Sequence, residues 1–113
     1  MTKLAEKIVV LVTCGSIDEG RRIGRALVER KLAACVNVVH APVESIYRWK
    51  GKVETANEFL LIIKTARSRF ALLEEAVKCL HSYQIPEIIA LPIEKGSRDY
   101  LSWLSDSVRS RSK

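Results

Sequence analysis

The sequence predicts an α+β fold: a ferredoxin-like sandwich of split βαβ units, with two helices on one face of a four-stranded antiparallel sheet. Two observations predict it. Apolar, β-branched runs alternate with helical patterns in the order strand–helix–strand, strand–helix–strand, and a short helix follows. Two of the strands are joined by a tight turn into an unusually long hairpin. The 113 residues, 48% of them hydrophobic, are enough for a single domain over residues 1–113.

The first strand is predicted at residues 8–13, an apolar run with no polar side chain before Thr13. Such a run is typical of a central strand that is covered on both faces. The first helix is predicted at residues 18–31. Ser16 precedes Glu19 by three residues, the spacing of a capping box, in which each side chain accepts a free backbone N–H at the helix start. The helix then divides into an apolar face and an arginine-rich face.

The second strand is predicted at residues 34–39. Pro42 ends or bends it, because proline cannot donate to a strand ladder. A hairpin follows, with arms at residues 43–49 and 53–65 around a turn at residues 50–51. The second arm would span about 43 Å, twice the length of a usual strand. The sequence therefore predicts a hairpin arm that extends beyond the body of a small domain.

Residues 59–63 in this second arm are all apolar, so both faces of the strand need cover there. One layer of helices can cover only one face of a sheet. We therefore expect the other face to be covered by another copy of the chain.

The second helix is predicted between Phe70 and Leu80, where apolar residues recur at helical spacing. The last strand, at residues 87–93, contains Pro92 near its end and is expected at an edge of the sheet. A final short helix is expected to begin at Asp99, whose carboxylate would cap it.

The three cysteines, Cys14, Cys35 and Cys79, are far apart in the sequence. Their odd number and wide spacing argue against a disulfide framework and against a CxxC metal or redox motif. Each is expected to be a small buried core residue. Cys14 precedes a predicted helix start, where the pKa of a thiol can be lowered, but no base or resolving thiol is evident beside it.

The net charge of +6 includes a basic tail at residues 109–113, which we expect to be disordered. The remaining positive charge is too small and too dispersed to indicate a nucleic-acid partner. Tyr47 and Trp49 alternate with Arg48 and Lys50, so rings and cations lie on opposite faces of the strand. The rings are therefore expected to pack against a neighbouring subunit. An RRM-like nucleic-acid module is the least favoured interpretation, because such sheets carry clustered aromatic residues.

No apolar run approaches the roughly 18 residues of a membrane span. The charged N-terminal segment leads into a short apolar stretch without a small-residue cleavage site, so no signal peptide is predicted. We expect a cytoplasmic protein without a membrane partner.

Five motifs in order along the chain resemble the divalent-cation tolerance proteins of the CutA family. They lie at residues 31–37, 45–51, 58–65, 81–88 and 100–104. The resemblance implies a homotrimer of ferredoxin-like subunits whose long hairpins wrap neighbouring chains. It also implies a role in tolerance of copper and other divalent metal ions, with binding of a metal ion or small effector at clefts between subunits.

The same resemblance suggests His81 and Glu87 as metal ligands, because both are motif residues flanking the connector before the last strand. Cys14 is a third candidate. The first and last strands are expected to be separated within the sheet, so loops or a neighbouring subunit would have to bring Cys14 near His81. Thiolate, imidazole and carboxylate together suit copper or zinc. Each residue also has a structural interpretation: a helix cap for His81, an interface ion pair for Glu87 and a core position for Cys14.

No arrangement of catalytic residues is evident. The sequence lacks a G-x-S-x-G elbow, a P-loop, a GxGxxG fingerprint and an HExxH pair. We therefore expect a protein that is not an enzyme. The alternative to metal tolerance is a trimeric protein-docking scaffold, or a signalling scaffold of the PII type, without metal chemistry.

Overall fold

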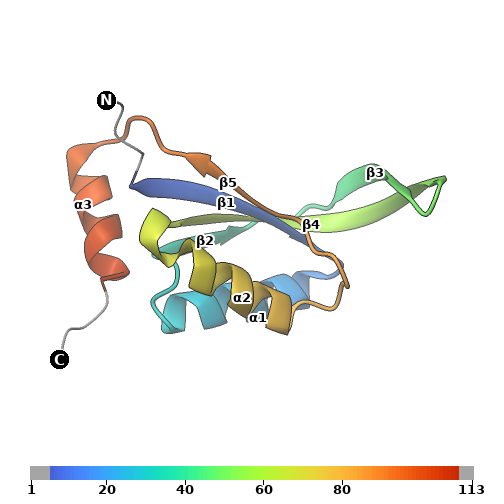
Figure 1. The fold of residues 1–113 in the computed structure, drawn as a ribbon, viewed down its shortest axis with the longest axis horizontal. Coiled ribbons are helices and arrows are strands. Elements are labelled where there is room, and N and C mark those ends of the chain that lie inside the picture. Colours follow the sequence, from blue (N-terminus) through green and yellow to red (C-terminus); the bar gives the residue numbers. More distant parts are fainter. Residues whose placement is uncertain (1–5, 110–113) are drawn as a thin grey trace.

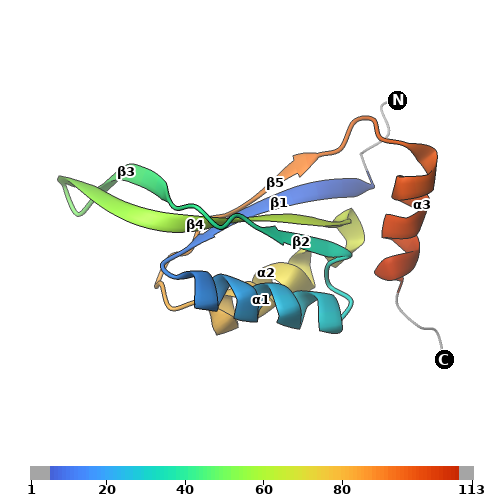
Figure 2. The same ribbon diagram turned by 180° about the vertical axis from the view of Figure 1, so that it is seen from behind.

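The computed structural model describes residues 6–109 (Figure 1). Within this range the chain forms a β-sheet with two helices beneath it and a third helix at one end (Figures 1 and 2). The elements are β1 (Lys7–Cys14), α1 (Ile17–Glu29), β2 (Cys35–Val38), β3 (Val43–Trp49), β4 (Lys52–Ala66), the 3-10 helix η1 (Arg67–Arg69), α2 (Phe70–Leu80), β5 (Ile88–Pro92) and α3 (Arg98–Ser107). None of these helices is long and apolar enough to cross a membrane.

The sheet is antiparallel throughout and has the order β2-β4-β1-β5. The predicted α+β architecture is confirmed, and β5 lies at an edge as predicted. The expected separation of the first and last strands is wrong, because β5 pairs directly with β1, from Ile8 opposite Pro92 to Val12 opposite Ile88. β4 occupies one edge of β1, so the chain that returns from α2 takes the other edge.

The long hairpin is present, and its second arm is longer than predicted. β4 has fifteen residues. Its inner half pairs with β1, from Phe59 to Ala66, and its outer half pairs with β3, from Lys52 to Glu58. The turn at Lys50 and Gly51 has positive φ angles of 52° and 81°. The β3–β4 arm extends past the helices and gives the chain a long axis of 46 Å (Figure 1).

The core lies between the sheet and the helices α1 and α2. Alternate residues of β1 and β4 point into it, and Leu61 and Ile63 are fully buried. Helix α1 lies very close to the sheet, because a Cβ at Gly20 would be 3.1 Å from Leu61 and a Cβ at Gly24 would be 3.0 Å from Val36. Two glycines on one helix face therefore set the spacing of the two layers.

Within residues 6–109, no helix covers the opposite face of the sheet (Figures 1 and 2). Its residues Leu60 and Ile62 are only half-buried, and Ile89 and Leu91 of β5 are about half exposed at 49% and 50%. We call these four residues the open sheet face. Helix α3 packs instead at the end of the sheet, where Leu104 is buried.

Several local expectations are corrected by the structure. Helix α3 is capped by Ser97, whose hydroxyl accepts from the Tyr100 N–H, while Asp99 lies within the first turn. Cys14 is buried as expected, but Cys35 is half-buried and Cys79 is exposed on α2. Arg109 forms an ion pair with Asp106. The rest of the predicted basic tail lies outside the described residues.

Replacing Leu61 by alanine should lower the free energy of unfolding by about 2–5 kcal/mol, because it leaves a cavity between the sheet and α1. Leu72→Ala on α2 is the matched control, since Leu72 is 49% exposed and should lose much less. Urea unfolding followed by circular dichroism measures both. Equal losses in the two variants would contradict the position of the core.

Candidate functional site

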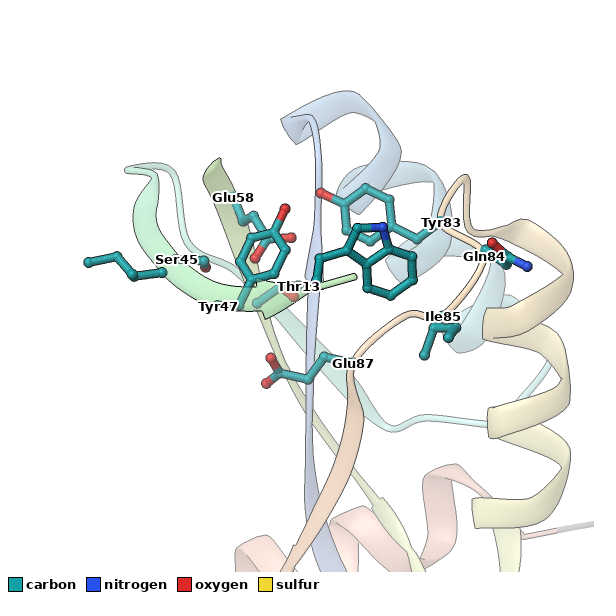
Figure 3. Close-up of a pocket in the computed structure, with 10 residues that line it drawn as sticks. Thr13, Ser45, Tyr47, Glu58, Tyr83, Gln84, Ile85 and Glu87 are labelled. Atoms are coloured by element: carbon teal, nitrogen blue, oxygen red, sulfur yellow. The ribbon is translucent and has the colours of Figure 1, made fainter. Parts of the chain in front are cut away.

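A cavity of about 540 Å³ lies where the β3–β4 arm meets the connector between α2 and β5. Figure 3 shows Tyr47 and Glu58 from the arm facing Tyr83 and Ile85 from the connector. The lining residues are Thr13, Ser45, Ile46, Tyr47, Trp49, Glu58, Tyr83, Gln84, Ile85 and Glu87. The cavity therefore combines aromatic rings with two carboxylates.

The connector is fixed to the body of the protein by His81, the residue that ends α2. The His81 ring lies 2.7 Å from the Thr13 carbonyl oxygen through Nε2, and Nδ1 accepts the Tyr83 N–H at 3.0 Å. Because Nδ1 accepts this bond, the proton of the neutral ring is on Nε2 and is donated to Thr13. Both ring nitrogens are therefore used within the protein.

Glu19 forms a second link between α1 and the connector. Its carboxylate accepts the Ser82 N–H at 2.7 Å and the Gly15 N–H at 3.3 Å, and it lies 3.6 Å from His81 Nδ1. The predicted capping box is thus half confirmed. Ser16 accepts the Glu19 N–H at 3.1 Å, but the Glu19 side chain reaches back to Gly15 and across to Ser82.

The electrostatics of Glu19 follow from these contacts. Burial alone would raise the pKa of its carboxyl group, but hydrogen bonds from Ser82 and from the Gly15 N–H together hold that pKa below its ordinary value. The charged form of Glu19 is therefore the form that holds α1 and the connector together.

Cys14 lies beneath this region, fully buried, with its thiol 3.6 Å from the carbonyl oxygens of Ser16 and Phe59. Burial, with the charges of Glu19 and Glu58 nearby, raises the pKa of the thiol to about 11. The nearby helix start does not lower it. The thiol is therefore protonated at neutral pH, which disfavours metal binding because a metal ligand must be a thiolate.

The chain does not bring Cys14, His81 and Glu87 together as a metal site. Among residues 6–109 no group of three His, Cys, Asp or Glu side chains is arranged to hold a metal ion. Cys14 is a buried thiol and both nitrogens of His81 are occupied. Of the three predicted ligands, only Glu87 is exposed, and it lines the cavity.

The places of Glu58 and Tyr83 in the site are not predicted from the sequence. Glu58 is only 8% exposed and lines the cavity together with Tyr83. Burial and the charge of Glu58 together raise the pKa of the Tyr83 hydroxyl. Tyr83 also lies against the backbone of Gly15, where a Cβ would be 3.3 Å from its hydroxyl oxygen. The signal in the sequence that could have indicated Glu58 is that this acidic residue directly precedes the apolar run at residues 59–63. Without the register of the strand, its position beside the connector could not be predicted.

The lowered pKa of Glu19 gives a prediction on stability against pH. The contribution of the Glu19 carboxylate to the free energy of unfolding is complete above the ordinary glutamate pKa. It is lost as the pH falls through the lower pKa that Glu19 has in the folded protein. Glu19→Gln should therefore lower the free energy of unfolding at pH 7 by roughly 1–3 kcal/mol and flatten its fall between about pH 5 and pH 3. Denaturant unfolding across this pH range measures both effects.

The matched control is Asp18→Asn, because Asp18 is the neighbouring acid on α1 and its side chain is 85% exposed. It should leave the pH dependence nearly unchanged. The same slope in Glu19→Gln as in the unmodified protein would contradict the assignment.

Comparison with known proteins identifies relatives along most of the chain. The family model of the CutA1 divalent ion tolerance protein matches residues 8–107. The divalent-cation tolerance protein CutA of Thermus thermophilus is 52% identical over 99 residues, which are 88% of this chain and 95% of that protein. "Protein CutA, chloroplastic" of Arabidopsis thaliana is 47% identical over 108 residues, covering 96% of this chain and 59% of that protein.

Solved structures agree with the fold. The Thermus thermophilus Cut A1 structure matches with a TM-score of 0.89 at 50% identity, over 91% of this chain and 99% of that one. The structure named as the periplasmic divalent cation tolerance protein CutA of Archaeoglobus fulgidus matches with a TM-score of 0.88 at 42% identity, over 91% and 99% of the two chains. The resemblance found in the five sequence motifs is thereby confirmed, and the chain belongs to the CutA1 divalent ion tolerance protein family.

Proposed function

We propose that this protein acts as a non-enzymatic homotrimer in the tolerance of divalent metal ions, copper among them. Its clefts between subunits would bind a metal ion or a small effector, and its place of action would be the cytoplasm. The single observation that carries the proposal is the open sheet face on a chain of the CutA1 family.

The open sheet face supports self-association. Leu60, Ile62, Ile89 and Leu91 form an apolar surface on the side of the sheet without helices. Contiguous apolar surface of this kind is characteristic of protein interfaces. The β3–β4 arm adds exposed apolar side chains at Ile46 and Val53 beyond the body of the chain. A closed ring of identical subunits would cover both the open face and the arm.

The metal role is supported by the names of relatives, which describe divalent-cation tolerance in Thermus thermophilus and Archaeoglobus fulgidus. Within one chain, Glu87 is the predicted ligand that remains available to an ion. Further ligands would have to come from a neighbouring subunit, in keeping with a site at a shared cleft. The residue set Cys14, His81 and Glu87 within one chain is not part of the proposal.

A trimeric docking or signalling scaffold is the second candidate. The observation that favours it is that residues 6–109 of a single chain contain no three-ligand group suited to a metal ion. Such a scaffold needs the assembled trimer but no metal.

The assembly is tested by light scattering behind a sizing column. We expect a mass about three times the 12.7 kDa of the chain at micromolar concentration. Leu91→Glu places a charge on the open sheet face and should give smaller species, while Leu72→Glu on the exposed side of α2 should not. A monomeric unmodified protein would contradict the trimer.

Metal binding is tested by calorimetric titration with Cu(II). The unmodified protein should bind, and Glu87→Gln and Leu91→Glu should each weaken binding at least tenfold, because one removes a ligand and the other separates the subunits. Cys14→Ser should bind as the unmodified protein does, since its thiol is buried. Loss of binding in Cys14→Ser alone would restore the thiol as a ligand. No binding by an intact trimer would favour the docking scaffold.

A further inference from the structure

The Nδ1 atom of His81 has two competing neighbours. In the neutral ring it accepts the Tyr83 N–H at 3.0 Å, while the Glu19 carboxylate lies 3.6 Å away, beyond hydrogen-bond distance. An imidazole nitrogen accepts when it is unprotonated and donates when it carries a proton. Nδ1 can therefore hold the Tyr83 N–H or donate to Glu19, but it cannot do both at once.

The other ring nitrogen of His81 keeps its partner in either state. Nε2 lies 2.7 Å from the Thr13 carbonyl oxygen, which can only accept, so Nε2 donates whether the ring is neutral or charged. Protonation therefore changes only the bond at Nδ1. It would set two donors, Nδ1–H and the Tyr83 N–H, against each other and leave the Tyr83 N–H without its acceptor.

Glu19 is suited to receive the new donor. Burial opposes its charge, but hydrogen bonds from Ser82 and Gly15 hold its pKa below the ordinary value, so it remains a carboxylate where imidazole becomes protonated. A movement of about 0.8 Å would shorten the 3.6 Å separation to the usual length of a charge-assisted bond. The same oxygen already accepts the Ser82 N–H at 2.7 Å, and its second lone pair can accept Nδ1–H.

These contacts lie inside one chain. The side chain of His81 is 0% exposed and that of Glu19 is 6% exposed, so a neighbouring subunit can only add to their burial. A charged imidazole is costly at such a position unless a carboxylate pairs with it. Glu19 is within reach to supply that carboxylate.

The other titratable and charged side chains of this region come from every element around the ring. They are Cys14 of β1, Glu19 of α1, Glu58 of β4, Lys78 of α2 and Tyr83 of the connector. Burial raises the pKa of the Cys14 thiol to about 11, and burial with the charge of Glu58 raises the pKa of the Tyr83 hydroxyl. Lys78 pairs with Glu74 on the exposed side of α2. Of these side-chain types and imidazole, only imidazole ordinarily changes its charge between pH 5 and pH 8.

We propose that His81 is a proton-sensitive switch for the connector between α2 and β5. The neutral ring holds the Tyr83 N–H through Nδ1. When the ring takes a proton from solvent, Nδ1–H turns to the Glu19 carboxylate and the Tyr83 N–H is released. Since residues 83–85 line the cavity, this release changes its wall. The inference goes beyond the proposed function, because it needs neither a metal ion nor an effector and its bonds lie within one chain.

The experiment follows full-length, metal-free protein labelled with ¹⁵N by NMR between pH 8 and pH 5. The chain has two histidines, so the exposed His40 serves as an internal reference. At pH 8 the ring nitrogens of His81 should show the Nε2–H tautomer. As the pH falls, Nδ1 should become protonated as well.

The backbone amides report what the protonation does. The Tyr83 amide should shift with the same midpoint as the His81 ring and lose roughly tenfold of its hydrogen-exchange protection, as expected for one lost hydrogen bond. The Ser82 amide, which donates to Glu19, should keep its protection. A general loosening of the connector would instead release both amides.

Substitutions assign the two partners. Glu19→Gln removes the receiving charge and should move the Tyr83 transition to lower pH by about one unit or more. Asp18→Asn is its matched control on the exposed side of α1 and should not move the transition. His81→Gln should abolish the transition, whereas His40→Gln should preserve it.

Three results would overturn the inference: a His81 ring that stays neutral down to pH 5, equal loss of protection at Ser82 and Tyr83, or a Tyr83 midpoint that Glu19→Gln leaves unchanged. The first two are measured on the unmodified protein, so they decide the matter even where Glu19→Gln fails to fold. Light scattering on the same samples reports the assembly separately. A trimer without the transition refutes only the switch, and a monomer that shows it refutes only the proposed assembly.

Discussion

β4 hydrogen-bonds with β1 and β2 along its inner half and with β3 along its outer half. Because one strand serves both the body and the arm, the position of the arm is set by the register of the core. The same strand places Leu61 against the helices and Leu60 on the open sheet face. Side chains alternate between the two faces of the sheet along β4. The core, the open sheet face and the position of Glu58 in the cavity wall therefore all follow from the register of this one strand.

Much of the fold could be predicted because it depends on local patterns. Apolar periodicity located the strands and helices, Pro42 separated β2 from β3, and the apolar run in β4 indicated a face that helices do not cover. The pairing of strands that are far apart in the sequence was harder to predict. The first and last strands were expected to lie apart in the sheet, and only the register of β5 shows that they are neighbours. The cap of α3 was also missed, because Ser97 and Asp99 are both good capping residues.

The candidate site was less predictable than the fold. His81 and Glu87 are conspicuous in the sequence, yet the state of His81 is decided by backbone groups of Thr13 and Tyr83, one of them 68 residues away. Glu19 is likewise fixed by Ser82, 63 residues further along the chain. A side chain that finds its partner within the protein is no longer free to bind a metal ion. His81 and Glu19 have such partners, whereas Glu58 and Glu87 face a cavity. Only the three-dimensional contacts show this difference.

The central place of β1 has a consequence for biosynthesis. Chains emerge from the ribosome N-terminus first, so β1 leaves the exit tunnel before the two strands that flank it, β4 and β5. Its neighbours arrive much later, since Cys14 pairs with Phe59 and Val12 pairs with Ile88. Closing such large loops costs entropy before any ladder bond is gained, which makes folding slow. Both edges of β1 are thus unpaired on the nascent chain until β4 and β5 have been made.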